Sequence, residues 1–151
     1  MISYLKRMFP YEEWANQQVI ETLTENDQTS LNLMMHIQAA KHIWLTRLTG
    51  EKRELKGFPE GDLESIKTWN NRNNTEFASW LSKQDESTIE ESFESMNVKR
   101  ERYSLKISDL MIQLMNHSTY HRAQIAKNIV ASGNQPNATD YLVYIQLVGN
   151  Q

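Results

Sequence analysis

The sequence predicts an all-α protein, built as a four-helix bundle with a long crossover connection. Four long segments carry apolar residues at spacings of three and four, which place one apolar stripe along a helix. Three prolines and five glycines in 151 residues leave most of the chain free to form long helices. The stretch Gly50–Gly61 gathers three of those glycines and one proline, so it predicts a loop long enough to cross one end of a bundle.

The first two helices are predicted over Ile2–Leu23 and Ser30–Leu48. Pro10 complicates the first, since a proline either begins a helix in its first turn or kinks it. The polar residues before Ser30 are candidates to cap the second helix, and Gly50 is a plausible stop. The apolar stripe of the first segment consists of Leu5, Met8, Tyr11, Trp14 or Ala15, Val19 and Leu23. That of the second consists of Leu33, His36 with Ile37, Ala40, Ile43 with Trp44, and Arg47 with Leu48.

A third helix is predicted to start near Asp62, whose side chain can cap it, and to run as far as Leu81. Its middle, Asn70–Asn74, reads NNRNN and has low helix propensity. The segment Glu90–Leu105 then alternates polar and apolar residues on both sides of a polar turn. This alternation predicts a short β-hairpin excursion before the last long helix.

The fourth long helix is predicted from Ser108 or Asp109, as its cap, to Ser132–Gly133. Its stripe consists of Leu110, Leu114, His117, His121, Ile125 and Ile129. A short apolar helix is expected at Asp140–Gly149. No internal repeat is visible, and the length favours one domain over residues 1–151.

Composition excludes several classes of function. The chain has no cysteine, which removes disulfides, thiolate zinc sites and cysteine nucleophiles. A formal charge of −3 disfavours nucleic acid as a partner, because phosphate binding depends on clustered Lys and Arg. No stretch approaches the roughly 20 apolar residues of a membrane span, and the N-terminus lacks the apolar run of a signal peptide. We expect a soluble, cytoplasmic protein.

Three of the four histidines are predicted to share one site. His117 and His121 lie four residues apart, so on a helix both project from one face, and the stripe around them aims that face at the core. His36 occupies an equivalent place in the second helix. His42 lies roughly 200° around that helix from Ala40, so we expect it to point outward and exclude it from the site.

Three imidazoles on two facing helices suit a zinc, nickel, copper or iron ion. A fourth position would stay open for water or a substrate thiolate, as in catalytic metal sites. The alternative is that the histidines are polar residues of a helix face without a ligand. Ser118 follows the first histidine where zinc proteases of the HExxH type carry a glutamate, so a metalloprotease is disfavoured.

Four stretches, in order, resemble the DinB/YfiT-like family over nearly the whole chain. They are YEEWANQQVIETL (Tyr11–Leu23), MMHIQAAKHIWLTRLTG (Met34–Gly50), MNHSTYHRAQIAKNI (Met115–Ile129) and DYLVYI (Asp140–Ile145). The resemblance implies one DinB-like four-helix bundle in which His36, His117 and His121 hold one divalent transition metal, zinc, nickel or similar. Ala123 stands where the family often has glycine, and His42 where many relatives have an acidic residue.

The resemblance does not specify a reaction. Some relatives transfer low-molecular-weight thiols such as bacillithiol, so it implies a metal-dependent thiol S-transferase or hydrolase, with a thiol or another small molecule as substrate. The competing hypothesis is a non-catalytic, stress-related bundle that binds metal or ligand. Homodimers are frequent among relatives. Gln124, one turn beyond His121, is the candidate to hold a ligating imidazole. Arg122 is expected at the surface or in a salt bridge, and no residue suggests itself as general base.

Overall fold

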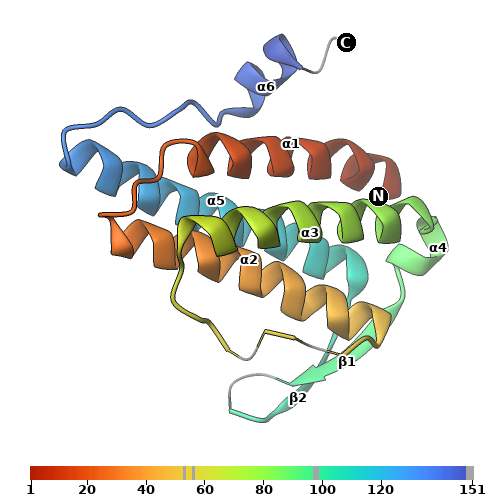
Figure 1. The fold of residues 1–151 in the computed structure, drawn as a ribbon. Coiled ribbons are helices and arrows are strands. Elements are labelled where there is room, and N and C mark those ends of the chain that lie inside the picture. The colour runs from red at the N-terminus through yellow and green to blue at the C-terminus, as the bar shows by residue number, and fades with distance from the viewer. Residues whose placement is uncertain (53, 56, 97–98, 149–151) are drawn as a thin grey trace.

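A computed structural model describes the chain except for residues 53, 56, 97–98 and 149–151. Its elements, in order, are α1 (Ile2–Ile20), α2 (Gln28–Thr49), α3 (Leu63–Ser82), α4 (Glu86–Ile89), β1 (Ser92–Met96), β2 (Arg102–Lys106), α5 (Ile107–Ala131) and α6 (Tyr141–Leu147). The four long helices form the bundle (Figure 1). The predicted all-α bundle with a β-hairpin is therefore confirmed.

The bundle places consecutive helices α1 and α2 diagonally, since each packs against both α3 and α5. Helices α1 and α5 run one way, and α2 and α3 run the other (Figure 1). Because α2 and α3 are parallel, the loop between them returns along the length of α2 instead of crossing one end of the bundle. Its path is fixed where the Glu54 N–H donates to His42 Nε2 (3.1 Å) and the Gly61 N–H donates to Asn32 Oδ1 (2.9 Å).

The predicted helix boundaries rest on side chains that cap them. Asp27 accepts a hydrogen bond from the backbone N–H of Ser30, and Asp62 accepts one from Ser65 in the same way. Helix α2 ends at Gly50, whose φ of 73° is the left-handed conformation that favours glycine. The predicted cap of α5 at Ser108 or Asp109 is wrong. Helix α5 begins at Ile107, directly after β2, and no side chain caps it.

Two stretches that contain residues unfavourable to helix, around Pro10 and at Asn70–Asn74, are continuous helix. Helix α1 runs from Ile2 through Pro10 to Ile20, so the helix does not begin at the proline. The segment Asn70–Asn74 lies within α3 because its amides are used in the core. Asn73 donates to the backbone oxygen of Gln38 (2.9 Å), and the Gln38 amide donates to Asn70 Oδ1 (3.2 Å). Buried hydrogen bonds between helices outweigh the low helix propensity of asparagine.

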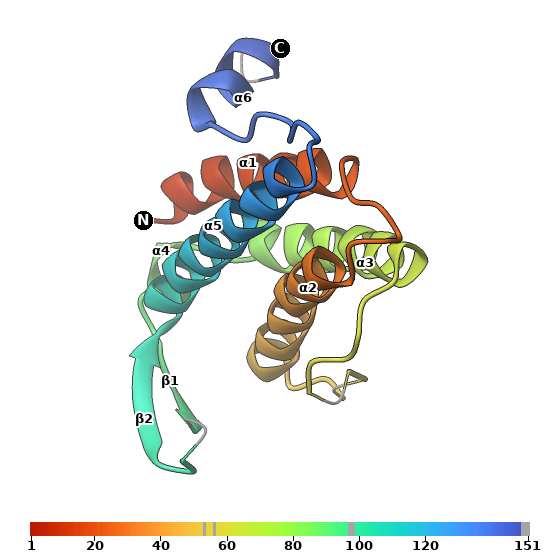
Figure 2. The same cartoon turned by 90° about the vertical axis from the view of Figure 1, so that its left-hand side faces the viewer.

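The hairpin pairs β1 with β2 antiparallel, with Ser92 opposite Lys106 and Met96 opposite Arg102. It projects from the bundle in the connection between α3 and α5 (Figure 2). The short helix α4, absent from the prediction, precedes it and is closed by a capping box at Asp85 and Thr88.

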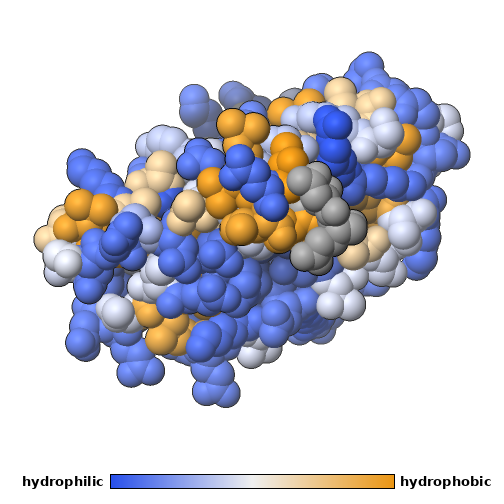
Figure 3. Space-filling model, turned by 90° about the horizontal axis from the view of Figure 1, so that it is seen from above, coloured by the Kyte–Doolittle hydropathy of each residue, from blue (hydrophilic) through white to orange (hydrophobic). Residues whose placement is uncertain are grey.

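The core consists of two apolar clusters, one around Phe77 and Leu110 and the other around Ile66 and Ile125. Helix α6 contributes no buried residue and lies against α1. Apolar side chains gather on the face of the molecule that carries α6 (Figure 3). Leu142 of α6 is 72% exposed. None of the described helices is long and apolar enough to cross a membrane.

Candidate metal centre

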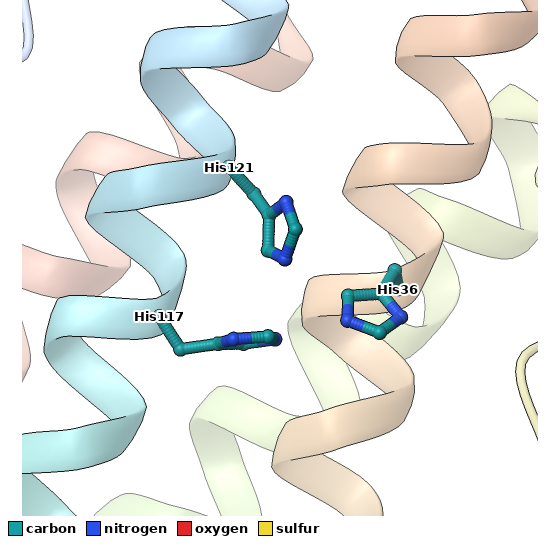
Figure 4. A group of neighbouring side chains, drawn as sticks. All are labelled: His36, His117 and His121. Carbon is teal, nitrogen blue, oxygen red and sulfur yellow. The ribbon is translucent and has the colours of Figure 1, made fainter.

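The three predicted histidines converge between α2 and α5. The ring centroids of His36 and His117 lie 4.9 Å apart, those of His36 and His121 4.8 Å, and those of His117 and His121 4.5 Å. One nitrogen from each ring can be chosen so that all three lie within 4.8 Å of one another. The rings point toward a common centre (Figure 4). This group could hold a metal ion.

Helix packing explains this convergence. The four-residue spacing stacks His117 and His121 on one face of α5, as the sequence predicts. Helix α2 runs antiparallel beside that face and presents His36 to it. About two turns along α5 from His121, the Asn128 amide donates to the Ser30 hydroxyl (3.2 Å), a bond that holds the two helices in this register.

Burial lowers the pKa of two of the three imidazoles. Burial and, after it, the nearby His121 lower the pKa of His36. Burial, followed by His121 and then His36, lowers the pKa of His117 to about 4. Both rings are therefore neutral near pH 7, which is the form that binds a metal ion.

Two further observations fit a bound cation. Gln124 Oε1 lies 2.8 Å from His121 Nδ1, and since a carbonyl oxygen only accepts, the contact fits the tautomer with its hydrogen on Nδ1, whose Nε2 lone pair is free for a metal ion. A ligating imidazole needs such a partner on its other nitrogen. His117 Nε2 is buried and has no hydrogen-bond partner among the described residues. A cation would satisfy this nitrogen, whose isolation otherwise costs free energy.

A pocket of about 450 Å³ opens beside the histidines, on the side of the α2–α3 loop. His36 and His121 line it together with Leu33, Phe58, Pro59 and Glu60. The Phe58 ring lies against His36, with centroids 4.2 Å apart. His36 and His121 are thus only half-buried and open to solvent on this side.

Behind the histidines, a buried polar cluster joins α1, α2 and α5; we define it as Glu12, Asn16, Lys41, Ser118 and Arg122. Lys41 Nζ donates to Glu12 Oε2 (2.9 Å), and the Asn16 amide donates to Glu12 Oε1 (2.6 Å). Arg122 donates to Asn16 Oδ1 (2.8 Å) and lies 3.8 Å from Glu12. Ser118 and Arg122 each directly follow a histidine, so α5 turns its histidines toward the candidate metal centre and these two residues to the interior.

The prediction for His42 is half wrong. The structure does not bring His42 into the histidine group, but its side chain is buried instead of pointing outward. Its ring packs against Trp69 of α3 at 4.7 Å and accepts from the Glu54 N–H. The apolar stripe suggested a solvent face here, whereas α3 and the returning loop cover it. The expectation that His117 and His121 look into the core is right only in part, since both are half-buried and His121 lines the pocket.

Arg122 is buried, so the expectation of a surface position is wrong. The alternative expectation, a salt bridge, agrees with its position 3.8 Å from Glu12. Sequence reasoning missed Phe58, Glu12 and Lys41. Glu12 and Asn16 lie at helical spacing between the buried residues Leu5 and Val19, and this polar interruption of the stripe is the signal that could have revealed the buried cluster. Phe58 has no comparable signal, because it lies in an irregular loop.

Comparison with known proteins identifies a family for this chain. The model of the DinB family matches residues 1–150. No curated protein and no solved structure matches the chain.

Proposed function

We propose that this chain, which belongs to the DinB family, binds one divalent transition metal through His36, His117 and His121 and acts as a metal-dependent enzyme of the thiol S-transferase or hydrolase kind. The observation that carries the proposal is the convergence of the three imidazoles, with ligand atoms within 4.8 Å of one another, beside an open pocket. The non-catalytic alternative shares this metal site but lacks turnover.

The residues around the site support a reactive centre more than a closed structural one. Three nitrogen ligands leave a coordination position free, and a bound divalent ion lowers the pKa of water or a thiol there. Gln124 orients His121, while Phe58 and Leu33 form walls on which a substrate can lie. In thiol transfer a bond forms between sulfur and the electrophilic carbon, the bond from that carbon to the leaving group breaks, and the thiol proton passes to solvent.

Metal content is the first test. Untagged protein should contain about one ion per chain, and His121→Ala should lose it, whereas the buried His42→Ala should retain it. Elemental analysis and titration with zinc or nickel measure this. Wild-type protein that binds no metal, or His121→Ala that binds as much as wild type, contradicts the metal site.

Turnover decides between the enzyme and the binding protein. Metal-loaded protein is incubated with monochlorobimane and a thiol such as bacillithiol, and fluorescence of the conjugate reports the reaction, with chloride as the leaving group. We expect turnover that His117→Ala abolishes. Fully loaded protein that is inert toward several thiols and esters favours the non-catalytic alternative.

A further inference from the structure

We infer that the pocket beside the three histidines binds the apolar portion of a small substrate, and that Phe58 is its main contact. The inference deepens the proposed function and rests on it for the end of the substrate that reaches the histidines. The pocket volume of about 450 Å³ lies in the range of small-molecule sites.

Phe58 is placed unusually for a phenylalanine. Its side chain is 58% exposed, yet its ring lies 4.2 Å from the ring of His36. A phenyl ring in a loop usually gains stability by turning into the core. This ring instead presents one side to the candidate metal centre and leaves apolar surface open to the pocket, where Leu33 and Pro59 extend it. An apolar group bound there would cover that surface.

The loop that carries Phe58 is fixed at both ends. At one end, the Glu54 carboxylate binds both terminal nitrogens of Arg72, at 2.6 and 2.7 Å. At the other, the Gly61 N–H donates to Asn32, and the Gln28 amide donates to the Gly61 oxygen (2.9 Å each). A side chain at position 61 would collide with the backbone of Leu31, so only glycine lets the loop lie this close to α2. Phe58 is therefore held over His36 between two anchors.

A second aromatic ring lies on the α5 side of the site. Tyr120 is 63% exposed, and its ring lies 5.2 Å from that of His121 in an edge-to-face arrangement. Aromatic rings thus border His36 from the α2–α3 loop and His121 from α5. Rings in such positions favour flat or apolar ligands through area burial and edge or face contacts.

Cobalt-loaded protein tests this with two small neutral thiols, benzyl mercaptan and ethanethiol, of which only the first carries an aromatic ring. Binding is followed by the charge-transfer absorption of the cobalt thiolate. We expect benzyl mercaptan to bind about tenfold more tightly, and Phe58→Ala to remove about that advantage while cobalt content stays unchanged. Tyr4→Ala, an exposed aromatic residue on α1, is the matched control and should change neither affinity. Equal affinities for the two thiols, or an unchanged preference in Phe58→Ala, would overturn the inference.

A second measurement separates failure of the pocket from failure of the metal site. Metal-free protein in EDTA is titrated with benzyl alcohol and followed by amide chemical shifts. We expect shifts confined to Leu33 and residues 57–60, lost in Phe58→Ala. If the protein takes up no cobalt, the proposed function fails and this titration alone decides the pocket: localised shifts support it, and their absence or uniform spread rejects it.

Discussion

Replacing Glu12 by Gln removes the single negative charge from the buried polar cluster while keeping the size of the side chain. Glu12 lies 2.9 Å from the ammonium of Lys41 and 3.8 Å from the guanidinium of Arg122, and these three side chains are only 2–3% exposed. After the change, two buried cations lose their counter-charge. Lys41 keeps Asn74 Oδ1 (3.0 Å), and Arg122 keeps Asn16 and the Thr119 hydroxyl (2.9 Å), all of which are neutral acceptors.

The expected loss follows from that arrangement. Removing one partner of a buried ion pair costs about 3–5 kcal/mol. The amide oxygen of glutamine still accepts a hydrogen bond, so we expect the free energy of unfolding at pH 7 to fall by about 3 kcal/mol, at the lower end of that range. This is a large part of the roughly 5–15 kcal/mol that stabilises a domain.

The loss should also depend on pH. Burial by itself would raise the pKa of Glu12, but the charges of Lys41 and Arg122, with hydrogen bonds from Lys41 and Ser118, hold it below its ordinary value of 4.5. A folded pKa below the unfolded one means that the carboxylate stabilises the fold fully above about pH 4.5, and that this is lost as pH falls through the folded pKa. The difference between wild type and Glu12→Gln should therefore shrink in acid.

Urea unfolding followed by helical circular dichroism, at pH 7 and in steps below pH 4.5, measures both effects. Glu76→Gln is the control, since Glu76 pairs with Arg72 at 2.7 Å but is 31% exposed, and it should cost at most about 1 kcal/mol. Adding Lys41→Met to Glu12→Gln should recover part of the loss, because a buried unpaired cation is removed. A loss in Glu12→Gln no larger than in Glu76→Gln would refute the reasoning.

Three further variants test the site and its supports. Gln124→Ala should weaken metal binding about 10- to 100-fold in a competition titration, because the imidazole of His121 loses the acceptor on Nδ1, and Gln124→Glu should restore it; equal affinity in all three proteins would contradict this. His42→Ala should lower the free energy of unfolding by about 2 kcal/mol, since a buried ring and the acceptor for the Glu54 N–H are lost, and thermal stability equal to wild type would contradict it. Gly61→Ala should destabilise by about 1–3 kcal/mol in urea unfolding, because its methyl group would lie 2.9 Å from Met35 Cβ and closer still to the Leu31 oxygen; an unchanged midpoint would show that the loop has room to move.

The sequence alone is sufficient for much of the fold. Spacing at three and four residues identifies the four long helices, and Asp62 and Gly50 mark two of their ends, as the structure confirms. Alternation predicts the hairpin of β1 and β2. The four-residue spacing of His117 and His121 also places both rings on one face of α5. All these features depend on neighbours within one or two helical turns, which is the range over which sequence pattern governs conformation.

The tertiary structure alone decides which faces are covered. His42 is buried because α3 and the returning loop lie over it. Arg122 is buried because it donates to Asn16 of α1 and lies beside Glu12 of the same helix. The asparagines of α3 stay helical because their amides bond across the core. Phe58 meets His36 only because α2 and α3 are parallel and the loop must run back along α2. Which side chains are buried, and which hydrogen-bond partners they have, depends on contacts between residues far apart in the chain. The periodicity of one helix cannot predict such contacts.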